Sequence, residues 1–239
     1  MPRTIAVIPA RGGSKGIPRK NLIDLGGKPL IAHMIGHALQ VEGITDVVVS
    51  TEDEEIADVA RQYGVQPPFM RPKSLAGDHV LSLPVVQHAV EQMETITAMP
   101  YRHILVLQAT VPLCRPEDIA ACLERLEKGD CDSVVSVKKI ANHHPFRLKR
   151  IIGEDVLINY VDQGFDDLRP RQVLPPVYKR TGAAYASTRE TVMTHNQIVG
   201  ENARAVIVPE YTGLDIDSEL DLALVRLIFD GKVDVNLLP

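Results

Sequence analysis

Aromatic residues are scarce in this sequence: tryptophan is absent, and aromatic side chains make up only 4% of the 239 residues. Proteins that read nucleic acid by stacking bases on aromatic rings usually carry more of them. The formal net charge of −5 points the same way, because a general binder of long polyanions is usually basic. We therefore expect no nucleic acid among the partners of this protein.

Cysteine is also rare, with three in the chain at Cys114, Cys122 and Cys131. The number is odd and no pair has Cys-x-x-Cys spacing, which argues against a disulfide framework and against a zinc cluster. We expect three reduced and mostly buried thiols. His143 and His144 are adjacent, but no third ligand stands at a useful spacing, so the pair does not predict a metal site.

Long apolar runs are missing as well. No stretch approaches the ~18 apolar residues that span a membrane, and the first residues have no long apolar stretch of the kind a signal peptide needs. We expect a cytoplasmic protein without a membrane partner.

Short strands alternate with helical patterns through the first part of the chain. Strands are expected at 4–8, 46–50, 103–107 and 133–137, and helical faces at 30–39, 56–63, 85–93 and 116–128. This alternation predicts an α/β fold, a Rossmann-like three-layer α/β/α arrangement around a mainly parallel sheet. In such sheets, ligands bind beyond the carboxyl ends of the strands.

The alternation stops at residue 138. Residues 138–180 show no helical period, and 146–160 read as a hairpin that turns at 153–155. We interpret 138–180 as an inserted lid or dimerisation arm between two parts of one domain, 1–137 and 181–239. Strands are expected again at 183–186 and 205–208. A last helix should pack through the face that carries Leu220, Ala223, Leu224, Leu227 and Ile228.

The loop after the first strand has the composition of a phosphate-binding loop. Its glycines let the backbone approach a ligand and present N–H groups to it. It matches neither G-x-x-x-x-G-K-[ST] nor G-x-G-x-x-G. Its cations could offset the roughly four negative charges of a triphosphate; they are Arg11, Lys15, Arg19 and Lys20. Residues 1–28 hold six Lys or Arg against one acid, which makes this the more basic end of an acidic protein.

Two carboxylates two residues apart form a candidate metal site. In extended backbone, residues i and i+2 point to the same side, so Asp215 and Asp217 should project together while Ile216 packs inward. Hard carboxylate oxygens beside phosphate and water suit Mg²⁺. The alternative is that Asp217 or Ser218 merely caps the last helix, but capping accounts for one acid and not for two.

Two further segments carry polar groups that could bind a sugar. Gln108 and Thr110 follow a central strand directly, at the sheet edge where ligands bind. The region 138–180 contains nine Lys or Arg against five acids. Within it, residues 169–172 (RPRQ), which include Arg171, together with Lys179 and Arg180 could supply an arginine fork that holds a planar carboxylate in bidentate fashion.

Taken in order, these segments resemble the acylneuraminate cytidylyltransferases, the CMP-sialic acid synthetases, whose relatives act on legionaminic or pseudaminic acid. The resemblance rests on a series of matching blocks. They are 8–21 (IPARGGSKGIPRKN), Arg71-Pro72, 75–78 (LAGD), 108–113, 143–145 (HHP), Arg171-Gln172, Gly182-Ala183 and 215–217 (DID).

The resemblance implies transfer of CMP from CTP to the anomeric hydroxyl of a nine-carbon α-keto acid sugar, with release of pyrophosphate. It implies Mg²⁺ on Asp215 and Asp217, and it makes these two residues, Arg11 and Lys20 catalytic. Gln108, Thr110, Arg171 and Gln172 would contact the sugar. It also implies a homodimer in which the arm reaches the partner's site. The nucleotide would be bound by Ala10, Arg11, Gly12, Gly13, Ser14, Lys15, Lys20, Asn21 and Arg71.

The sequence departs from the family pattern on the sugar side. Ala109, Val111 and Cys114 stand where the family often has proline, serine and arginine, and Thr181 replaces an asparagine. These changes leave other acceptors open, such as an eight-carbon acid sugar of the lipopolysaccharide type, and GTP or UTP as donor. A non-catalytic nucleotide-binding regulatory protein is a further alternative, against which the retained carboxylate pair argues.

Overall fold

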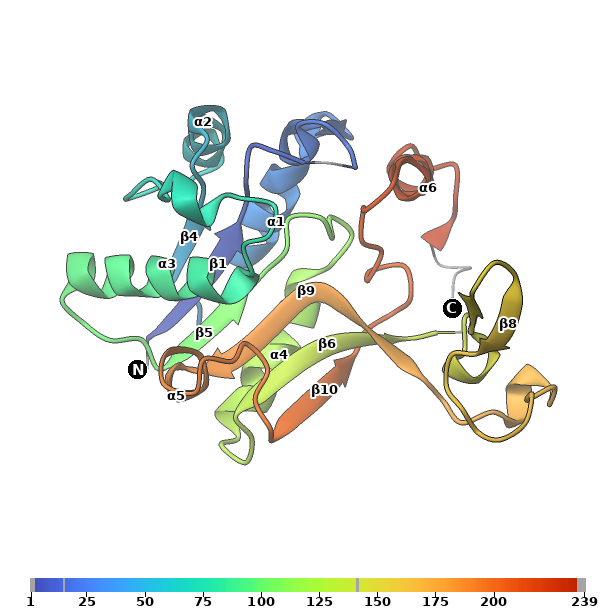
Figure 1. Ribbon diagram of the computed structural model, residues 1–239. Coiled ribbons are helices and arrows are strands. Elements are labelled where there is room, and N and C mark those ends of the chain that lie inside the picture. The colour runs from blue at the N-terminus through green and yellow to red at the C-terminus, as the bar shows by residue number, and fades with distance from the viewer. Residues whose placement is uncertain (1–2, 15, 141, 236–239) are drawn as a thin grey trace.

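The computed structural model describes residues 3–14, 16–140 and 142–235. They fold around one six-stranded sheet with helices on both faces (Figure 1). The strand order is β10-β6-β9-β5-β1-β4. The strands are β1 Thr4–Pro9, β4 Asp46–Ser50, β5 His103–Val106, β6 Ser133–Lys139, β9 Tyr178–Thr188 and β10 Ala203–Ile207. The predicted α/β fold is confirmed.

β9 runs against its neighbours in this sheet. The other pairs, β1 with β4, β1 with β5 and β10 with β6, are parallel, whereas β9 is antiparallel to both β5 and β6. The sheet is therefore mainly parallel. The direction of β9 could not be predicted, because a buried apolar strand has the same residue pattern in either direction.

Because successive side chains of a strand point to opposite faces of the sheet, each face has its own hydrophobic core. On β1, Ile5 and Val7 face α3 and α5, while Ala6 and Ile8 face α1, α2 and α4. All four are fully buried, and burial of each branched side chain contributes about 1.5–3 kcal/mol. The helices are α1 Leu30–Leu39, α2 Glu54–Gln62, α3 Ser82–Thr97, α4 Pro116–Glu127 and α5 Arg189–Met193.

The last helix, α6 (Glu219–Phe229), packs through a different face from the expected one. Leu222 and Val225 are buried in a third core cluster, together with residues of the loop after β1. Leu220, Leu224 and Leu227 are 79%, 41% and 41% exposed, so the predicted packing face is wrong. Apolar residues surround most of this helix, and the chain on either side of it decides which of them turn inward.

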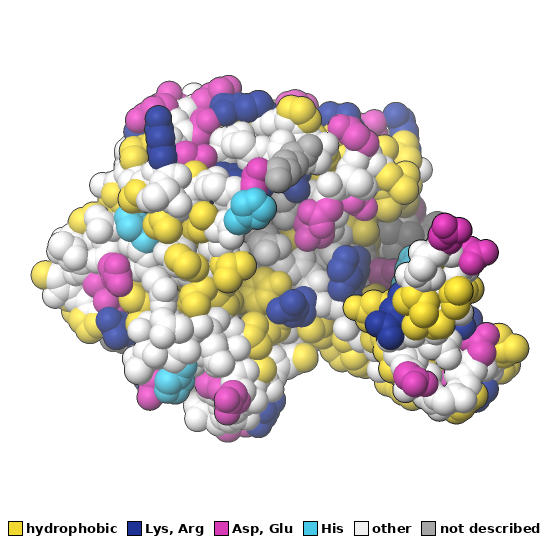
Figure 2. All heavy atoms as spheres, in the orientation of Figure 1, with side chains coloured by type: hydrophobic (Ala, Val, Ile, Leu, Met, Phe, Trp, Pro, Cys, Tyr) yellow, Lys and Arg dark blue, Asp and Glu magenta, His cyan; other side chains and the backbone are white. Residues whose placement is uncertain are grey.

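An arm leaves the sheet between β6 and β9 and lies to one side of it (Figure 1). Its described part comprises residues 140 and 142–177. The predicted range was 138–180, but β6 and β9 still pair at Lys139 and Tyr178, so the arm is slightly shorter at both ends. The predicted hairpin is present as β7 (Lys149–Ile152) and β8 (Val156–Asn159). Figure 2 shows hydrophobic side chains gathered on this arm.

Smaller elements complete the described chain. They are β2 Asp24–Leu25, β3 Lys28–Pro29 and the 3-10 helices η1 Lys20–Leu22, η2 Lys73–Leu75, η3 Pro145–Arg147 and η4 Arg171–Val173. The three cysteines are free and buried, as expected, and burial raises the pKa of Cys122 to about 12. Within the described ranges, no helix combines the length and apolar content needed to cross a bilayer.

Candidate active site

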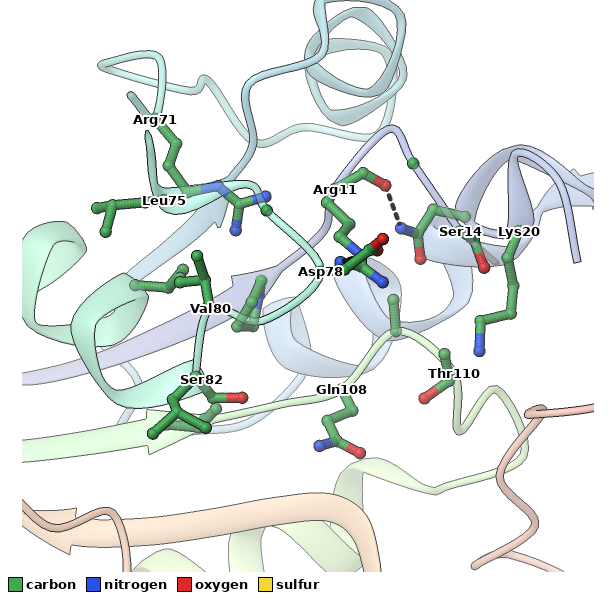
Figure 3. A pocket seen from close by; sticks show the side chains of 18 of the residues that line it. Arg11, Ser14, Lys20, Arg71, Leu75, Asp78, Val80, Ser82, Gln108 and Thr110 are labelled. Atoms are coloured by element: carbon green, nitrogen blue, oxygen red, sulfur yellow. Dashed lines mark hydrogen bonds and ion pairs between the residues drawn. The ribbon is translucent and has the colours of Figure 1, made fainter. Parts of the chain in front are cut away.

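A cavity of about 490 Å³ lies beyond the carboxyl ends of β1 and β5. Three segments far apart in the sequence meet around it: the loop after β1, the loop before α3 and the turn after β5 (Figure 3). The segment before α6 closes one side. Ten of the residues predicted for the site line this cavity: Arg11, Gly13, Ser14, Lys20, Asn21, Arg71, Gln108, Thr110, Asp215 and Asp217.

The remaining predicted residues are placed differently. Ala10 is buried in a core cluster and Gly12 does not line the cavity. Gln172 lies in η4 of the arm and does not line it either, and the side chain of Arg171 in the same helix falls outside what the structure describes. Lys15 falls outside the described residues. Among the described side chains, the structure therefore brings together most of the expected nucleotide residues and both carboxylates, but not Gln172 of the arm.

Side chains from the segment before α2 and from η1 hold the backbone of the loop after β1 in place. The Gly12 N–H donates to Glu52 Oε1 at 2.8 Å, and the Asn21 side-chain amide donates to the carbonyl of Arg11 at 3.0 Å. A Cβ at Gly12 would collide with the Asp53 carboxylate, so any larger residue there would force that side chain, which pairs with Arg19, to move. These contacts fix the backbone of the loop at Arg11 and Gly12.

One of the four loop cations does not belong to the site. Arg19 pairs with Asp53 and with Glu55, away from the cavity, and its hydrogen bond to Asp53 raises its pKa. The expectation that Arg19 helps to offset phosphate charge is thus corrected. Arg11 lines the cavity and forms an ion pair with Asp78 at 2.9 Å. Asp78 sits on the loop before α3; it ends the matching block 75–78, but the sequence analysis assigned it no role.

Arg71 is the most buried cation of the cavity, with 4% of its side chain exposed. Its Nη2 donates to Glu52 Oε2 at 2.5 Å, while its buried Nε has no partner among the described residues. A buried guanidinium donor without a partner costs free energy unless a ligand accepts from it. Glu52, which the sequence analysis missed, accepts one hydrogen bond from Arg71 and another from the Gly12 N–H. It thereby connects Arg71 to the loop after β1.

Lys20 connects the loop to the carboxylate pair. Its Nζ donates to the Ile216 carbonyl at 2.6 Å and lies 3.4 Å from Asp217 Oδ1. Ile216 is fully buried and its N–H donates to the Thr110 carbonyl at 2.9 Å, which fixes the extended segment. Asp215 and Asp217 both line the cavity as a result, while Ser218 caps α6.

The carboxylate pair fits a hard cation. Burial raises the pKa of Asp215, and its Oδ1 is buried with no hydrogen-bond partner among the described residues. A bound cation would satisfy that oxygen. No cluster of three or more His, Cys, Asp or Glu side chains suited to a metal occurs in the described ranges. The pair would therefore need phosphate oxygens and water to complete the coordination shell of the ion.

A buried lysine near this pair was missed from the sequence. Lys138 on β6 is 9% exposed, and burial lowers its pKa, with Asp215 acting in the opposite direction. Lys138 is the first residue of the range 138–180 that the sequence analysis assigned to the arm. The sequence pattern contained no signal for its location, because the register of β6 against β9 decides where its side chain lies.

Gln108 owes its position to a glycine on β9. The Gln108 N–H donates to the Gly182 carbonyl at 3.1 Å, and Gly182 has a φ of +77°. A Cβ at Gly182 would lie 2.1 Å from Gln108 Oε1. Glycine is therefore required here both for the backbone conformation and for the space that the glutamine side chain fills.

A second cavity, of about 420 Å³, adjoins the first and shares four lining residues with it: Leu81, Ser82, Val106 and Gln108. Its other walls come from β9 and from the segment after α5. The remaining lining residues are Leu83, Arg180, Tyr185, Gln197, Ile198 and Val199. The site thus has two compartments that meet at Gln108.

Comparison with solved structures shows the same fold. The chain superimposes on a CMP:2-keto-3-deoxy-manno-octonic acid synthetase complexed with CTP, with a TM-score of 0.72 and 22% identity. The match covers 97% of this chain and 100% of the other. A 4-diphosphocytidyl-2C-methyl-D-erythritol synthase from Anaerococcus prevotii matches with a TM-score of 0.66 and 13% identity, over 95% and 96% of the two chains.

Sequence comparison gives more specific relatives. The chain is 32% identical to pseudaminic acid cytidylyltransferase of Campylobacter jejuni, over 95% of this chain and 96% of that one. It is 34% identical to CMP-N,N′-diacetyllegionaminic acid synthase of Legionella pneumophila, over 95% and 97%. The family model described as cytidylyltransferase matches residues 5–225. The chain belongs to the cytidylyltransferase family, in the branch that includes the acylneuraminate, pseudaminic acid and legionaminic acid enzymes.

Proposed function

We propose that this protein transfers CMP from CTP to the anomeric hydroxyl of a nine-carbon α-keto acid sugar and releases pyrophosphate. The observation that carries this proposal is the meeting, around one cavity, of Arg11 and Lys20 from the loop after β1, the buried Arg71 and the carboxylate pair. Relatives whose names specify pseudaminic and N,N′-diacetyllegionaminic acid support the acceptor class. Because CTP is made and used in the cytoplasm, we place the reaction there.

The protein's part in this reaction is positioning and charge stabilisation. The sugar hydroxyl oxygen bonds to the α-phosphorus as the bond from that phosphorus to the leaving pyrophosphate breaks, and the hydroxyl proton is released to water. Arg11 and Lys20, at the two ends of the loop after β1, would offset the negative charge of the phosphates. Arg71, with its free Nε, would hold the nucleotide deeper in the cavity.

Asp215 and Asp217 would hold Mg²⁺, which neutralises phosphate charge when bound. Lys20 keeps the two carboxylates in place through its bond to the Ile216 carbonyl between them. Gln108 and Thr110 would orient the sugar at the junction of the two cavities. No covalent attachment of substrate to the protein is needed, because positioning the two substrates in line can supply much of the rate.

The reaction can be tested by measuring pyrophosphate release with Mg²⁺ and each of the four nucleoside triphosphates. The acceptors would be pseudaminic, N,N′-diacetyllegionaminic and N-acetylneuraminic acids and an eight-carbon 3-deoxy acid sugar. We expect release with CTP and a nine-carbon acid. Release only with the eight-carbon acid, or only with GTP or UTP, would contradict the proposal. Tight CTP binding with no release on the whole panel would favour a regulatory protein.

We also propose that two copies associate through the arm. Ile151, Leu157 and Leu168 on the arm are 66%, 63% and 84% exposed, and an apolar surface of this kind marks an interaction site. The family resemblance implies the same arrangement. We expect sedimentation to give about twice the chain mass of 26.3 kDa, and Leu157→Glu to give the monomer. A monomeric parent protein at micromolar concentration would refute the dimer.

A further inference from the structure

Asp78 places a negative charge in the part of the cavity where the proposed function puts phosphate groups. Its carboxylate forms an ion pair with Arg11 at 2.9 Å, and both residues line the first cavity. Figure 3 shows the two side chains meeting there, Arg11 from the loop after β1 and Asp78 from the loop before α3. The arginine proposed to offset phosphate charge is therefore already paired with an anion of the protein.

The other ion-paired arginine of this cavity is held in a different way. The side chains of Arg71 and Glu52 are only 4% and 15% exposed, and Glu52 does not line the cavity. Those of Arg11 and Asp78 are 34% and 39% exposed. Separating a buried pair leaves unpaired charge in the interior, whereas partly exposed partners remain hydrated when they part. The Arg11–Asp78 pair can therefore be opened by a ligand at a much smaller cost in free energy.

The segment that carries Asp78 can yield without disturbing the sheet. Residues 76–81 connect η2 to α3, and their turn closes locally, with the Val80 N–H donating to the Gly77 carbonyl at 3.1 Å. Leu81, at the end of the segment, is 74% exposed. A segment with local backbone bonds and little buried apolar surface moves more readily than the core beneath it. Asp78 can thus leave Arg11 while the rest of the cavity keeps its shape.

A bound triphosphate would compete with Asp78 for the same guanidinium. Because it carries several negative charges, it attracts Arg11 more strongly than one carboxylate does, and it repels that carboxylate. Once pyrophosphate has left, Arg11 needs a counter-ion again, and Asp78 is the acid that stands beside it. An ion pair that stabilises only the unliganded protein lowers the apparent affinity for each phosphate ligand that must break it.

We propose that Asp78 is an internal counter-ion of Arg11, displaced by the triphosphate and restored as pyrophosphate leaves. This inference rests on the proposed function and adds to it a residue that sets how readily the product is released. Asp78 acts through Arg11 and is not itself a catalytic residue. Its presence would keep both CTP and pyrophosphate from binding as tightly as the cations of the cavity alone would allow.

The test is to replace Asp78 by asparagine, which removes the charge and keeps the size of the side chain. We expect the Kd values for CTP and for inorganic pyrophosphate, measured by calorimetry with Mg²⁺, to fall roughly 3- to 10-fold. The inhibition constant of pyrophosphate in the transfer assay should fall with them. The gain should shrink at high ionic strength, because salt screens partly exposed charges. Asp58→Asn is the matched control, since it removes the same charge from an exposed Asp–Arg pair of α2 that lines neither cavity.

A double-mutant cycle shows whether Asp78 acts through Arg11. In an Arg11→Gln background the guanidinium is gone, so Asp78→Asn should tighten pyrophosphate binding much less than it does in the parent. An equal gain in both backgrounds would mean that Asp78 acts only as a distant negative charge, and would overturn the inference. Unchanged or weaker binding of CTP and pyrophosphate by the single variant Asp78→Asn would overturn it too, and would show that Asp78 holds Arg11 ready for phosphate.

The outcomes distinguish this inference from the proposed function. If the parent releases pyrophosphate with none of the acid sugars, the proposed function falls, but calorimetry with CTP and pyrophosphate still decides the role of Asp78. Tighter binding by Asp78→Asn than by the parent and Asp58→Asn supports it. Equal or weaker binding, or no binding of either ligand by any of the three proteins, refutes it.

Discussion

Replacing Asp217 by asparagine is expected to lower kcat for CMP transfer by roughly 10²- to 10³-fold. The substitution removes one charge from the pair proposed to hold Mg²⁺ and leaves the size of the side chain almost unchanged. Because 72% of the Asp217 side chain is exposed, the free energy of unfolding should stay within about 0.5 kcal/mol of the parent value. Steady-state kinetics and denaturant unfolding measure the two effects separately.

A second readout does not depend on turnover. Mg²⁺ with CTP should raise the unfolding temperature of the parent, because a ligand that binds only the folded state stabilises it, and should raise that of Asp217→Asn much less. Glu219→Gln, an exposed acid at the start of α6, is the control and should behave like the parent. Removing Mg²⁺ with a chelator should abolish the parent's activity reversibly. Wild-type turnover in Asp217→Asn would show that the metal assignment is wrong.

Lys20→Met is expected to lower kcat/KM for CTP by roughly 10²- to 10³-fold as well, for a different reason. The methionine keeps the apolar stem but removes the ammonium that lies between the loop after β1 and the carboxylate pair. The Ile216 carbonyl also loses its 2.6 Å donor, so we expect a stability loss of about 1 kcal/mol. The conservative variant Lys20→Arg should recover part of the activity, since it keeps the charge.

Lys28→Met is the matched control for this lysine, because Lys28 is exposed on β3 and lines neither cavity. Calorimetry with CTP should show weakened binding only in the Lys20 variant. Unchanged CTP affinity together with unchanged turnover would place the phosphates away from Lys20. A variant that loses activity only through unfolding would be recognised by its unfolding curve.

Much of the site could be predicted because it depends on local sequence. The loop after β1 follows a strand whose apolar residues specify a buried position. The pair Asp215 and Asp217 needs only an extended backbone to project to one side. Here the residue types and their spacing contain the relevant geometry, and the structure places both segments at the same cavity.

The parts that could not be predicted depend on which segments meet. Arg19 looks like the other loop cations in sequence, and only the position of Asp53 turns it away from the cavity. Glu52 and Asp78 had no role assigned from the sequence, yet each forms an ion pair with one of the cavity's arginines. Arg180 enters the second cavity through the antiparallel direction of β9, which the hydrophobic pattern does not specify.

The position of β9 also has a consequence for biosynthesis. β9 lies between β5 and β6 but is translated after the arm, so 49 residues separate the end of β6 at Lys139 from the end of β9 at Thr188. At ~5–20 residues per second, a ribosome needs roughly 2–10 seconds to add them. Throughout that time β5 and β6 lack the neighbour that lies between them in the finished sheet, and the hydrophobic residues of the arm are being added to the chain. The order of the strands thus makes a growing chain most prone to aggregation just before the strand that closes its sheet emerges.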